Sequence, residues 1–469
     1  MTSPSNDKAA LHAYEPVSVL ETISYGLGDC GFNLYWAPLT AFFMIYLTDV
    51  VGVHPAAVGA LMVTMRLISA IADPVFGAIA DRTQTQYGRY RPWFLWLAVP
   101  LAAAGILAFS VADVPQSMKL IAVYVTVIFL NLVYTAGNVA YNALSGVITP
   151  DSRQREIMMS LRFGGAFLSA VFITWLTPKL VAFTGPGQEA LGWQFAMTVY
   201  GVALIAIFVN LFLHTDERFS QDSAPHKNPV RDVGDLFKNR PWVVLFALGS
   251  VVMVAFTLHM SATPYYMKYY LGRPDLVTSF AMSFSLGLAA GSAATMLLTR
   301  LLSRPMLIAA MLVILAGASL GLYYVSPGQL TTIFILQVVT GMALGTVSTI
   351  TFAMYADVAD FNAWKTGHRA TAMTYSMINF GKKIGAAVAA ALIGWALSSK
   401  GYTANAAPSA GLLENIRLMM GLVPAVLAFA GALIACVYNL TPKAVARLQA
   451  DIMGGVTQGV SGAGINPPL

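Results

Sequence analysis

The sequence of 469 residues has few charges: Lys, Arg, Asp and Glu make up 10% of it, against roughly a quarter in soluble proteins. So few charged side chains cannot form the water-facing surface of two or three ordinary soluble domains, which excludes that class. Hydrophobic residues make up 57%, enough for many helices of about 20 apolar residues, the length that spans a bilayer. The composition therefore predicts an all-α membrane protein that crosses the bilayer many times.

Cysteine is nearly absent, and the common enzyme motifs are missing. The two cysteines, Cys30 and Cys436, lie in separate apolar segments without zinc or redox spacing, so we expect packing thiols. The sequence has no zinc-protease motif, phosphate-binding loop or nucleophile elbow. We therefore expect no enzyme activity, cofactor or metal site, and a membrane-embedded enzyme is the weaker alternative.

The apolar residues fall into runs on both sides of a polar stretch. The runs lie at about 22–48, 55–80, 93–112, 118–148, 156–183 and 193–213, then at about 241–270, 276–299, 305–325, 329–356, 370–398 and 412–438. This pattern predicts a cytoplasmic N-terminal segment (1–21), a six-helix bundle (22–214), a cytoplasmic linker (215–240), a second six-helix bundle (241–440) and a cytoplasmic tail (441–469).

The basic residues predict the orientation of these helices. Of the 27 Lys and Arg residues, about 17 lie in the segments on the side of the termini and about six in the opposite loops. Because cytoplasmic loops carry the excess of basic residues, both termini are expected in the cytoplasm. The net charge of +6 thus reflects membrane topology and indicates membrane lipid, not nucleic acid, as a partner. The oligomeric state is not specified.

Several motifs resemble those of one transporter family. Gly77-Ala-Ile-Ala-Asp81-Arg82 and Gly88-Arg-Tyr-Arg-Pro92 resemble the loop signature of the major facilitator superfamily. The segments 24–29, 46–52, 66–74, 265–272 and 355–360 resemble, in order, those of the glycoside–pentoside–hexuronide:cation symporters, the group that contains the melibiose permease. The resemblance implies a major facilitator fold of 12 transmembrane helices, a bacterial inner membrane, and cation-coupled import of a sugar or glycoside. Proton-coupled efflux or lysolipid movement on the same fold is the alternative.

A charged face in the second run is the first candidate site. Arg66, Ser69 and Asp73 lie at i, i+3 and i+7, on one face of a helix. A charge inside the membrane costs a few kcal/mol or more, so it lines a cavity or finds a partner. The alternative is an Arg–Asp arrangement that only steadies the bundle. The resemblance implies a cation site, in which Asp73 keeps one of two carboxylates and Ser69 replaces the other, which favours H⁺ over Na⁺.

The first run contains the second candidate site. Asp29, Asn33 and Trp36 share a helix face, and an aromatic plane beside hydrogen-bonding groups suits a sugar ring. Packing of Trp36 against a helix or lipid is the alternative. By resemblance, the sugar site further includes Asn138, Asn142, Arg162, Asn379 and Lys383. Because the permease has carboxylates where this chain has Asn33, Ser69 and Asn138, a hexuronide or sulfo-sugar is slightly favoured over a neutral glycoside.

Charged residues at the predicted cytoplasmic mouth form a candidate gate. Tyr141 to Arg155 and Tyr355 to Arg369 have the same spacing in the two halves, as expected of transporter repeats. These charges either form a wet rim or make ion pairs between the halves that close the inner side. The candidate gate residues are Asp81, Arg82, Arg155, Asp357, Asp360 and Arg369.

Overall fold

The computed structural model describes residues 17–112, 114–149, 151–185, 187–218, 229–366, 371–400 and 408–440. The N-terminal half contains α2 (Val19–Ala41), α3 (Phe43–Ile45), η1 (Tyr46–Val50), α4 (Pro55–Arg82), α5 (Arg91–Ala108), α6 (Gln116–Ile148), α7 (Ser152–Ala182) and α8 (Glu189–His214). The C-terminal half contains α10 (Arg240–Tyr265), η2 (Tyr266–Tyr270), η3 (Pro274–Leu276), α11 (Val277–Leu298), α12 (Arg304–Tyr324), α13 (Leu330–Thr366), α14 (Thr371–Ser398), α15 (Ala410–Arg417), η4 (Leu418–Leu422) and α16 (Val423–Cys436). A short helix, α9 (Pro229–Phe237), lies in the predicted linker.

Eleven helical segments in the described part of the chain are long and apolar enough to cross a membrane. The segment from α2 to η1, which the sequence predicts as the first span, is not among them. It carries Glu21, Asp29 and Asn33 within α2, and these lower its hydropathy. It nevertheless packs along α7 and α8 as a member of the N-terminal half. Its polar side chains therefore face protein, where they build the site described below.

The lipid-facing and protein-facing sides of α4 are separated by helical spacing. One face carries apolar side chains four residues apart that are 46–68% exposed: Val63, Leu67, Ile71, Val75 and Ile79. Ser69 and Asp73 point away from this stripe and are buried. An apolar stripe with a polar inner face is the pattern of a helix between lipid and a polar cavity.

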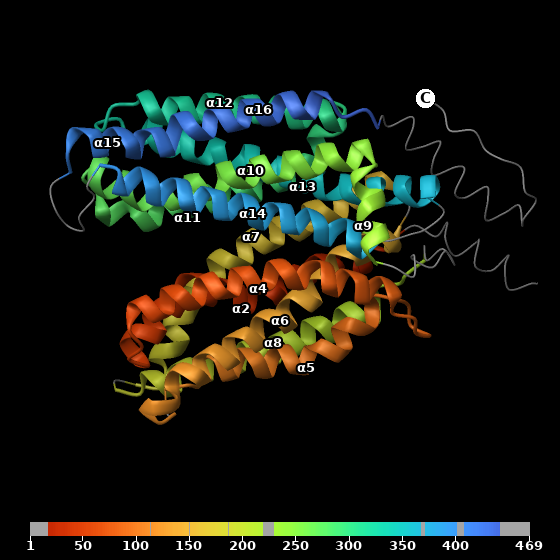
Figure 1. Cartoon of the computed structure of the whole chain (residues 1–469), viewed down its shortest axis with the longest axis horizontal. Coiled ribbons are helices and arrows are strands. Elements are labelled where there is room, and N and C mark those ends of the chain that lie inside the picture. The colour runs from red at the N-terminus through yellow and green to blue at the C-terminus, as the bar shows by residue number, and fades with distance from the viewer. Residues whose placement is uncertain are drawn as a thin grey trace, which may run out of the picture.

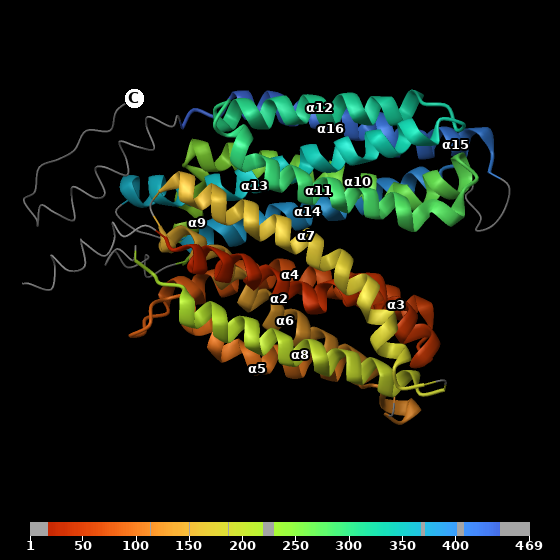
Figure 2. The ribbon, with the colours of Figure 1, turned by 180° about the vertical axis from the view of Figure 1, so that it is seen from behind.

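The two halves lie side by side, and their most extensive contacts are between two pairs of helices. Helix α4 packs against α14, and α7 packs against α11. The halves approach each other at the end where α8 finishes and α10 begins, which we call the linker end, and diverge towards the opposite end, the far end (Figures 1 and 2). This geometry brings the ends of α4, α7, α13 and α14 together at the linker end.

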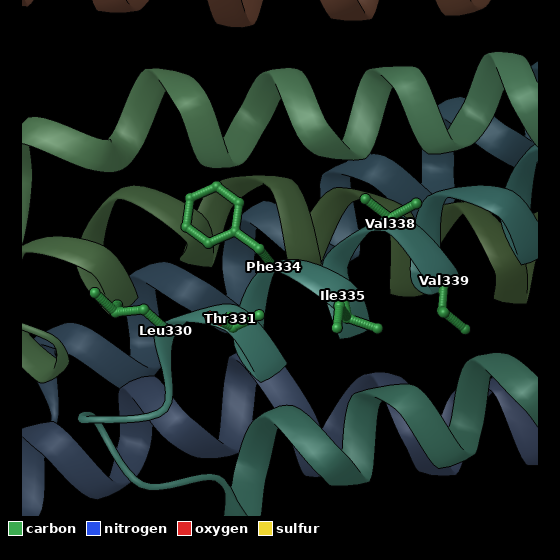
Figure 3. Close-up of a pocket in the computed structure, with 6 residues that line it drawn as sticks. All are labelled: Leu330, Thr331, Phe334, Ile335, Val338 and Val339. Carbon is green, nitrogen blue, oxygen red and sulfur yellow. The ribbon is translucent and has the colours of Figure 1, made fainter.

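A depression of about 540 Å³ on the C-terminal half is lined by one side of α13 alone (Figure 3). Its lining consists of Leu330, Thr331, Phe334, Ile335, Val338 and Val339. Five of these six side chains are hydrocarbon, which suits contact with lipid chains and offers little to a sugar. The polar groups expected of a substrate site lie elsewhere, in the N-terminal half and at its contact with α14.

Candidate substrate and cation site

Arg162 of α7 is the centre of a buried polar cluster in the N-terminal half. Its Nε lies 2.9 Å from Oδ2 of Asp29, and its two Nη atoms donate to Tyr25 Oη at 3.3 Å and to Asn142 Oδ1 at 2.7 Å. The guanidinium also lies 4.5 Å from the centre of the Tyr141 ring. Both the edge and a face of the guanidinium are thus engaged, so its position is fixed by α2 and α6.

Two predicted amides extend this cluster in different ways. Asn142 donates to Asn138 Oδ1 at 2.9 Å, which leaves the Asn138 side chain at the edge of the network. Asn33 donates to the backbone oxygens of Asp29 and Ala166, both at 3.2 Å. The Asn33 amide nitrogen therefore ties α2 to α7, and only the amide oxygen is left to bind a substrate hydroxyl.

Trp36 faces a cavity. Its ring stacks on Tyr134 with centroids 5.4 Å apart and planes at 26°, and the residue is 48% exposed. The cavity has a volume of about 350 Å³ and is lined by Tyr35, Trp36, Leu39, Thr40, Met62, Met65, Arg66, Ser69, Leu130, Asn131 and Tyr134. A stacked aromatic pair beside amide and hydroxyl groups can bind the apolar face and the hydroxyl edge of a sugar.

Asp73 of α4 pairs with the opposite half of the molecule. Its Oδ2 lies 2.7 Å from Nζ of Lys383 on α14, and the same ammonium donates to the Ser69 backbone oxygen at 3.0 Å. Ser69 Oγ donates to the backbone oxygen of Arg66, one turn earlier. Although Arg66 shares a helix face with Asp73, it is exposed and lines the Trp36 cavity. The carboxylate is therefore held by the partner that α14 supplies.

The remaining predicted residue of this group, Asn379, lies one turn before Lys383 on α14 and is partly buried. His259 of α10, whose side chain could carry a proton by type, donates from Nε2 to Gln337 Oε1 of α13 at 2.9 Å and stacks on Phe284. It is 1% exposed and lies within the C-terminal half. This hydrogen bond joins α10 to α13 within that half.

At the linker end, Arg155 of α7 joins the two halves. It is fully buried, and its Nη atoms lie 3.0 Å from Asp357 Oδ1 and 2.8 Å from Asp360 Oδ2, both on α13. Its Nε and Nη2 also donate to the backbone oxygens of Thr149 and Gly146. Every nitrogen of the guanidinium thus has an acceptor, as a buried ion pair requires.

A second arginine that the sequence prediction missed completes this network. Arg304, the first residue of α12, pairs with Asp357 at 2.5 Å and with Glu156 of α7. Ser152 of α7 donates to Asp357 at 2.7 Å. Glu156 follows Arg155 in the sequence and is also buried. The neighbouring acidic and basic residues at the start of α7 were therefore a sequence signal for this network. Nothing local in the sequence places Arg304 against it.

Asp81 at the end of α4 accepts from the first turn of α14. Its carboxylate receives the backbone N–H groups of Ala372 and Met373, both at 2.8 Å, and the hydroxyl of Tyr90 at 2.6 Å. Burial, followed by the adjacent Asp81 carboxylate, raises the pKa of Tyr90 well above its ordinary value, so its hydroxyl stays protonated and donates. A carboxylate from one half thereby caps a helix of the other.

The loop between α4 and α5 is closed by Glu217, which follows α8. Its carboxylate accepts the backbone N–H groups of Arg89, Tyr90 and Arg91 at 2.7–2.8 Å. Burial raises the pKa of Glu217, and the three N–H donors oppose that rise. Gly88 has φ of +106°, and a Cβ there would lie 2.5 Å from the Glu217 carboxyl carbon. The glycine of the loop motif is thus required by both backbone angle and space.

Two further residues, Arg82 and Arg369, belong to the predicted gate. Arg82 donates to the backbone oxygen of Ala78 on its own helix at 3.0 Å. Arg369 lies outside the described residues. At the far end, ion pairs such as Arg273–Asp275 and Arg417–Glu414 stay within the C-terminal half. Ion pairs between the halves are therefore found at the centre and the linker end.

Comparison with known proteins identifies the family. A family model described as "MFS/sugar transport protein" matches residues 24–442. The chain belongs to this family. It is 31% identical to the inner membrane symporter YicJ of Escherichia coli (strain K12), over 91% of this chain and 93% of that one. It is 28% identical to the isoprimeverose transporter of Lactiplantibacillus pentosus, over 96% of this chain and 94% of that one.

The fold agrees with this membership. The structure is similar to the crystal structure of the E. coli fucose:proton symporter FucP, with a TM-score of 0.64 at 13% identity, covering 90% of this chain and 98% of that one. The predicted all-α major facilitator fold and the resemblance to glycoside symporters are confirmed. The chain is a multi-pass membrane transporter, and the prediction that it is not an enzyme is confirmed by its family. Its cation, substrate and membrane orientation remain predictions.

Proposed function

We propose that this transporter imports a sugar or glycoside together with a proton, by alternating access across a bacterial cytoplasmic membrane with both termini inside. Its family of sugar transporters and its similarity to a symporter and to an isoprimeverose transporter support the substrate class. The excess of basic residues on the side of the termini supports the orientation. With that orientation, the linker end faces the cytoplasm and is closed by ion pairs, while the halves diverge towards the outside.

The observation that carries the proposal is the Asp73–Lys383 pair at 2.7 Å between α4 and α14. The pair holds a single carboxylate, 3% exposed, against one ammonium from the other half. A proton on Asp73 removes the attraction and releases Lys383, which loosens a contact between the halves at the point where they must move. Protonation of this carboxylate and rearrangement of the halves are thereby linked.

A proton fits this position better than a metal cation. Hard cations bind several oxygen ligands at once. Here the Ser69 hydroxyl donates to its own helix, and the Ser69 carbonyl already accepts from Lys383. Asp73 therefore has one carboxylate that faces the Lys383 ammonium. These two groups can exchange a proton but do not supply several oxygen ligands for a metal cation.

Sugar binding is assigned to the space between Trp36 and the Arg162 cluster. The Trp36–Tyr134 stack supplies an apolar plane, and the Arg162 cluster supplies the oxygen acceptors of Asp29 and Asn138. Because Asp29 is held by Arg162, the carboxylate is oriented before a substrate arrives, which lowers the entropy cost of binding.

The test is transport by purified protein in liposomes with an imposed pH gradient. Asp73→Asn should abolish accumulation driven by the gradient while sugar exchange at equal concentrations persists, because the neutral amide mimics the protonated state but cannot release a proton. Lys238→Met, an exposed lysine in the linker, is the control and should behave as the parent. Sodium-stimulated uptake that ignores pH would contradict the proposal. Counterflow with lysolipids in place of sugars would overturn the substrate class.

A further inference from the structure

A second cavity lies between α7 and the helices of the C-terminal half. It has a volume of about 210 Å³ and is lined by Phe163, Phe167, Leu248, Gly249, Val252, Met253, Phe256, Leu288, Leu344, Val347, Ser348, Thr351, Phe352, Tyr355 and Lys382. Residues of both halves thus face one space, as in a transporter whose site lies at the interface of its repeats. Lys382 is the one charged residue in this lining.

Lys382 differs from its neighbour Lys383 in its surroundings. Lys383 pairs with the Asp73 carboxylate, whereas Lys382 Nζ lies over the Phe352 ring, 3.9 Å from its centre, and 5.3 Å from the centre of the Tyr355 ring. Within the described part of the chain, no carboxylate pairs with Lys382. An aromatic face stabilises an ammonium only partly, so this cation can still take an anion.

The hydroxyl of Tyr355 is the second polar group at this cavity. Tyr355 is 0% exposed, and its Oη makes no hydrogen bond to any described residue. Gly249 of α10 provides room for both groups, because a Cβ there would lie 3.0 Å from Tyr355 Oη and 3.5 Å from Lys382 Cε. A buried hydroxyl left without a partner is costly unless a ligand or water binds it. An ammonium and a hydroxyl donor therefore meet at one place in an apolar cavity.

Arg162 does not supply the anion site. It shares the Phe352 ring with Lys382, at 5.2 Å from the ring centre, so it adds positive potential nearby. However, each of its three nitrogens already donates a hydrogen bond within its own half, to Asp29, Tyr25 or Asn142. With Asp29 balancing Arg162 and Asp73 balancing Lys383, the charge of Lys382 is left over.

We propose that Lys382 and Tyr355 bind the anionic group of the substrate, and that the substrate is a glycoside carrying a carboxylate or a sulfonate. This inference rests on the proposed sugar transport. The ammonium supplies charge, Tyr355 donates a hydrogen bond, and the rings of Phe352 and Phe163 cover the apolar part of the substrate. A substrate bound in this way contacts both halves, with its anion on α13 and α14 and its apolar part against Phe163 of α7.

The experiment measures binding of matched probes to the purified full-length protein by calorimetry and thermal shift. The probes are methyl glucoside, methyl xyloside, methyl glucuronide and sulfoquinovose, so the sugar scaffold is kept while the charge at one end changes. The parent protein should bind the two acidic probes more tightly than the two neutral ones. Lys382→Met should weaken acidic binding by about tenfold or more, as removal of a charge-assisted hydrogen bond does, and Lys382→Arg should restore much of it.

Tyr355→Phe keeps the ring but removes the hydroxyl, so it should weaken the binding of the acidic probes severalfold. It provides the test if Lys382→Met does not fold. Lys238→Met, outside the cavity, is the matched lysine control and should leave binding unchanged. If the neutral probes bind and the acidic ones do not, the anion inference is wrong while sugar transport stands. If Lys382→Met weakens neutral and acidic probes alike, or changes only the pH dependence, the inference is also wrong. If no sugar binds or is transported, the proposed function itself fails.

Discussion

The charged groups at the linker end and those at the centre are both buried between the halves, but they are satisfied to different degrees. At the linker end, Arg155 has four acceptors, and Asp357 receives Arg155, Arg304 and Ser152. At the centre, Asp73 has one ion-pair partner, and Lys382 pairs with no carboxylate of the described residues. Fully satisfied networks hold one arrangement, whereas groups with few partners can exchange them for a ligand.

The two groups of charges therefore have different roles. The linker-end network holds one conformation, and the central groups take part in transport. The linker-end network closes one side of the molecule and must break as a unit when that side opens. The central groups change partners when a proton or a substrate binds. Variants at the linker end should therefore shift the balance between conformations, and variants at the centre should change coupling and specificity.

The largest conformational effect is expected for Arg155→Ala. It removes the buried ion-pair partner that Asp357 and Asp360 share, and breaking a buried pair typically costs about 3–5 kcal/mol. The closed linker end should lose most of its population. In a Cys30→Ser, Cys436→Ser background, a cysteine at the buried Ala356 should then react faster with a thiol reagent applied from the cytoplasm.

A cysteine at the exposed Lys238 controls for reagent access and should label equally in both backgrounds. Unchanged labelling at Ala356 with normal transport would mean that the charges at the linker end reflect only the preference of basic residues for the cytoplasmic side of a membrane. The proposed difference between the linker end and the centre would then be contradicted.

A smaller effect is expected for Asp81→Ala. Asp81 caps the first turn of α14 through Ala372 and Met373, and loss of such a cap costs about 0.5–2 kcal/mol. Labelling at Ala356 should rise less than with Arg155→Ala. Asp81→Asn, which keeps an acceptor oxygen, should lie between Asp81→Ala and the parent. Equal labelling in all three proteins would show that Asp81 does not stabilise the closed linker end.

The loop closed by Glu217 gives a pH dependence within one half. Because burial raises the pKa of Glu217, its contribution to stability is present below the ordinary glutamate pKa and is lost as pH rises through the raised value. Glutamine does not ionise, so Glu217→Gln removes this loss of stability. The unfolding temperature of the detergent-solubilised variant, relative to that of the parent, should therefore be higher at neutral pH than in acid. The opposite trend would show that the three backbone N–H donors, not burial, decide the ionisation.

The smallest effect is expected at the far end. Arg273 and Asp275 form an exposed pair two residues apart within the C-terminal half. Exposed pairs contribute little because water and salt screen them. Arg273→Ala should leave unfolding temperature, labelling at Ala356 and transport as in the parent. A transport defect would indicate that the far end also closes through charge.

The sequence predicts the helical architecture well because lipid exposure leaves a strong pattern. The stripe of apolar residues on α4 and the polar first helix with Asp29 both follow from residue type and helical spacing. The pairing of the charges does not follow. Arg66 is the local candidate for Asp73, yet Lys383, some 310 positions later, holds the carboxylate. Such partners depend on how two halves meet, which spacing within one helix cannot specify.

Residue type also does not show where a backbone atom is the partner. Asn33 is predicted as a sugar ligand, and in the structure its amide nitrogen donates to the backbone oxygens of Asp29 and Ala166, which leaves its amide oxygen for a substrate. Arg304 is one of several basic loop residues in the sequence, and only the fold brings it to Glu156 and Asp357. Lys382 stands beside Lys383 and differs from it only through the helix face that it occupies.

The central claim is that sugar and proton move together through Asp73. It is tested most directly by recording the pH outside weakly buffered liposomes that contain the parent protein, after a transported sugar is added without any imposed gradient. The account predicts that the outside medium becomes alkaline as protons enter with the sugar, and that Asp73→Asn abolishes this change while sugar exchange continues. Sugar uptake without any pH change, or with a change that Asp73→Asn preserves, would contradict it.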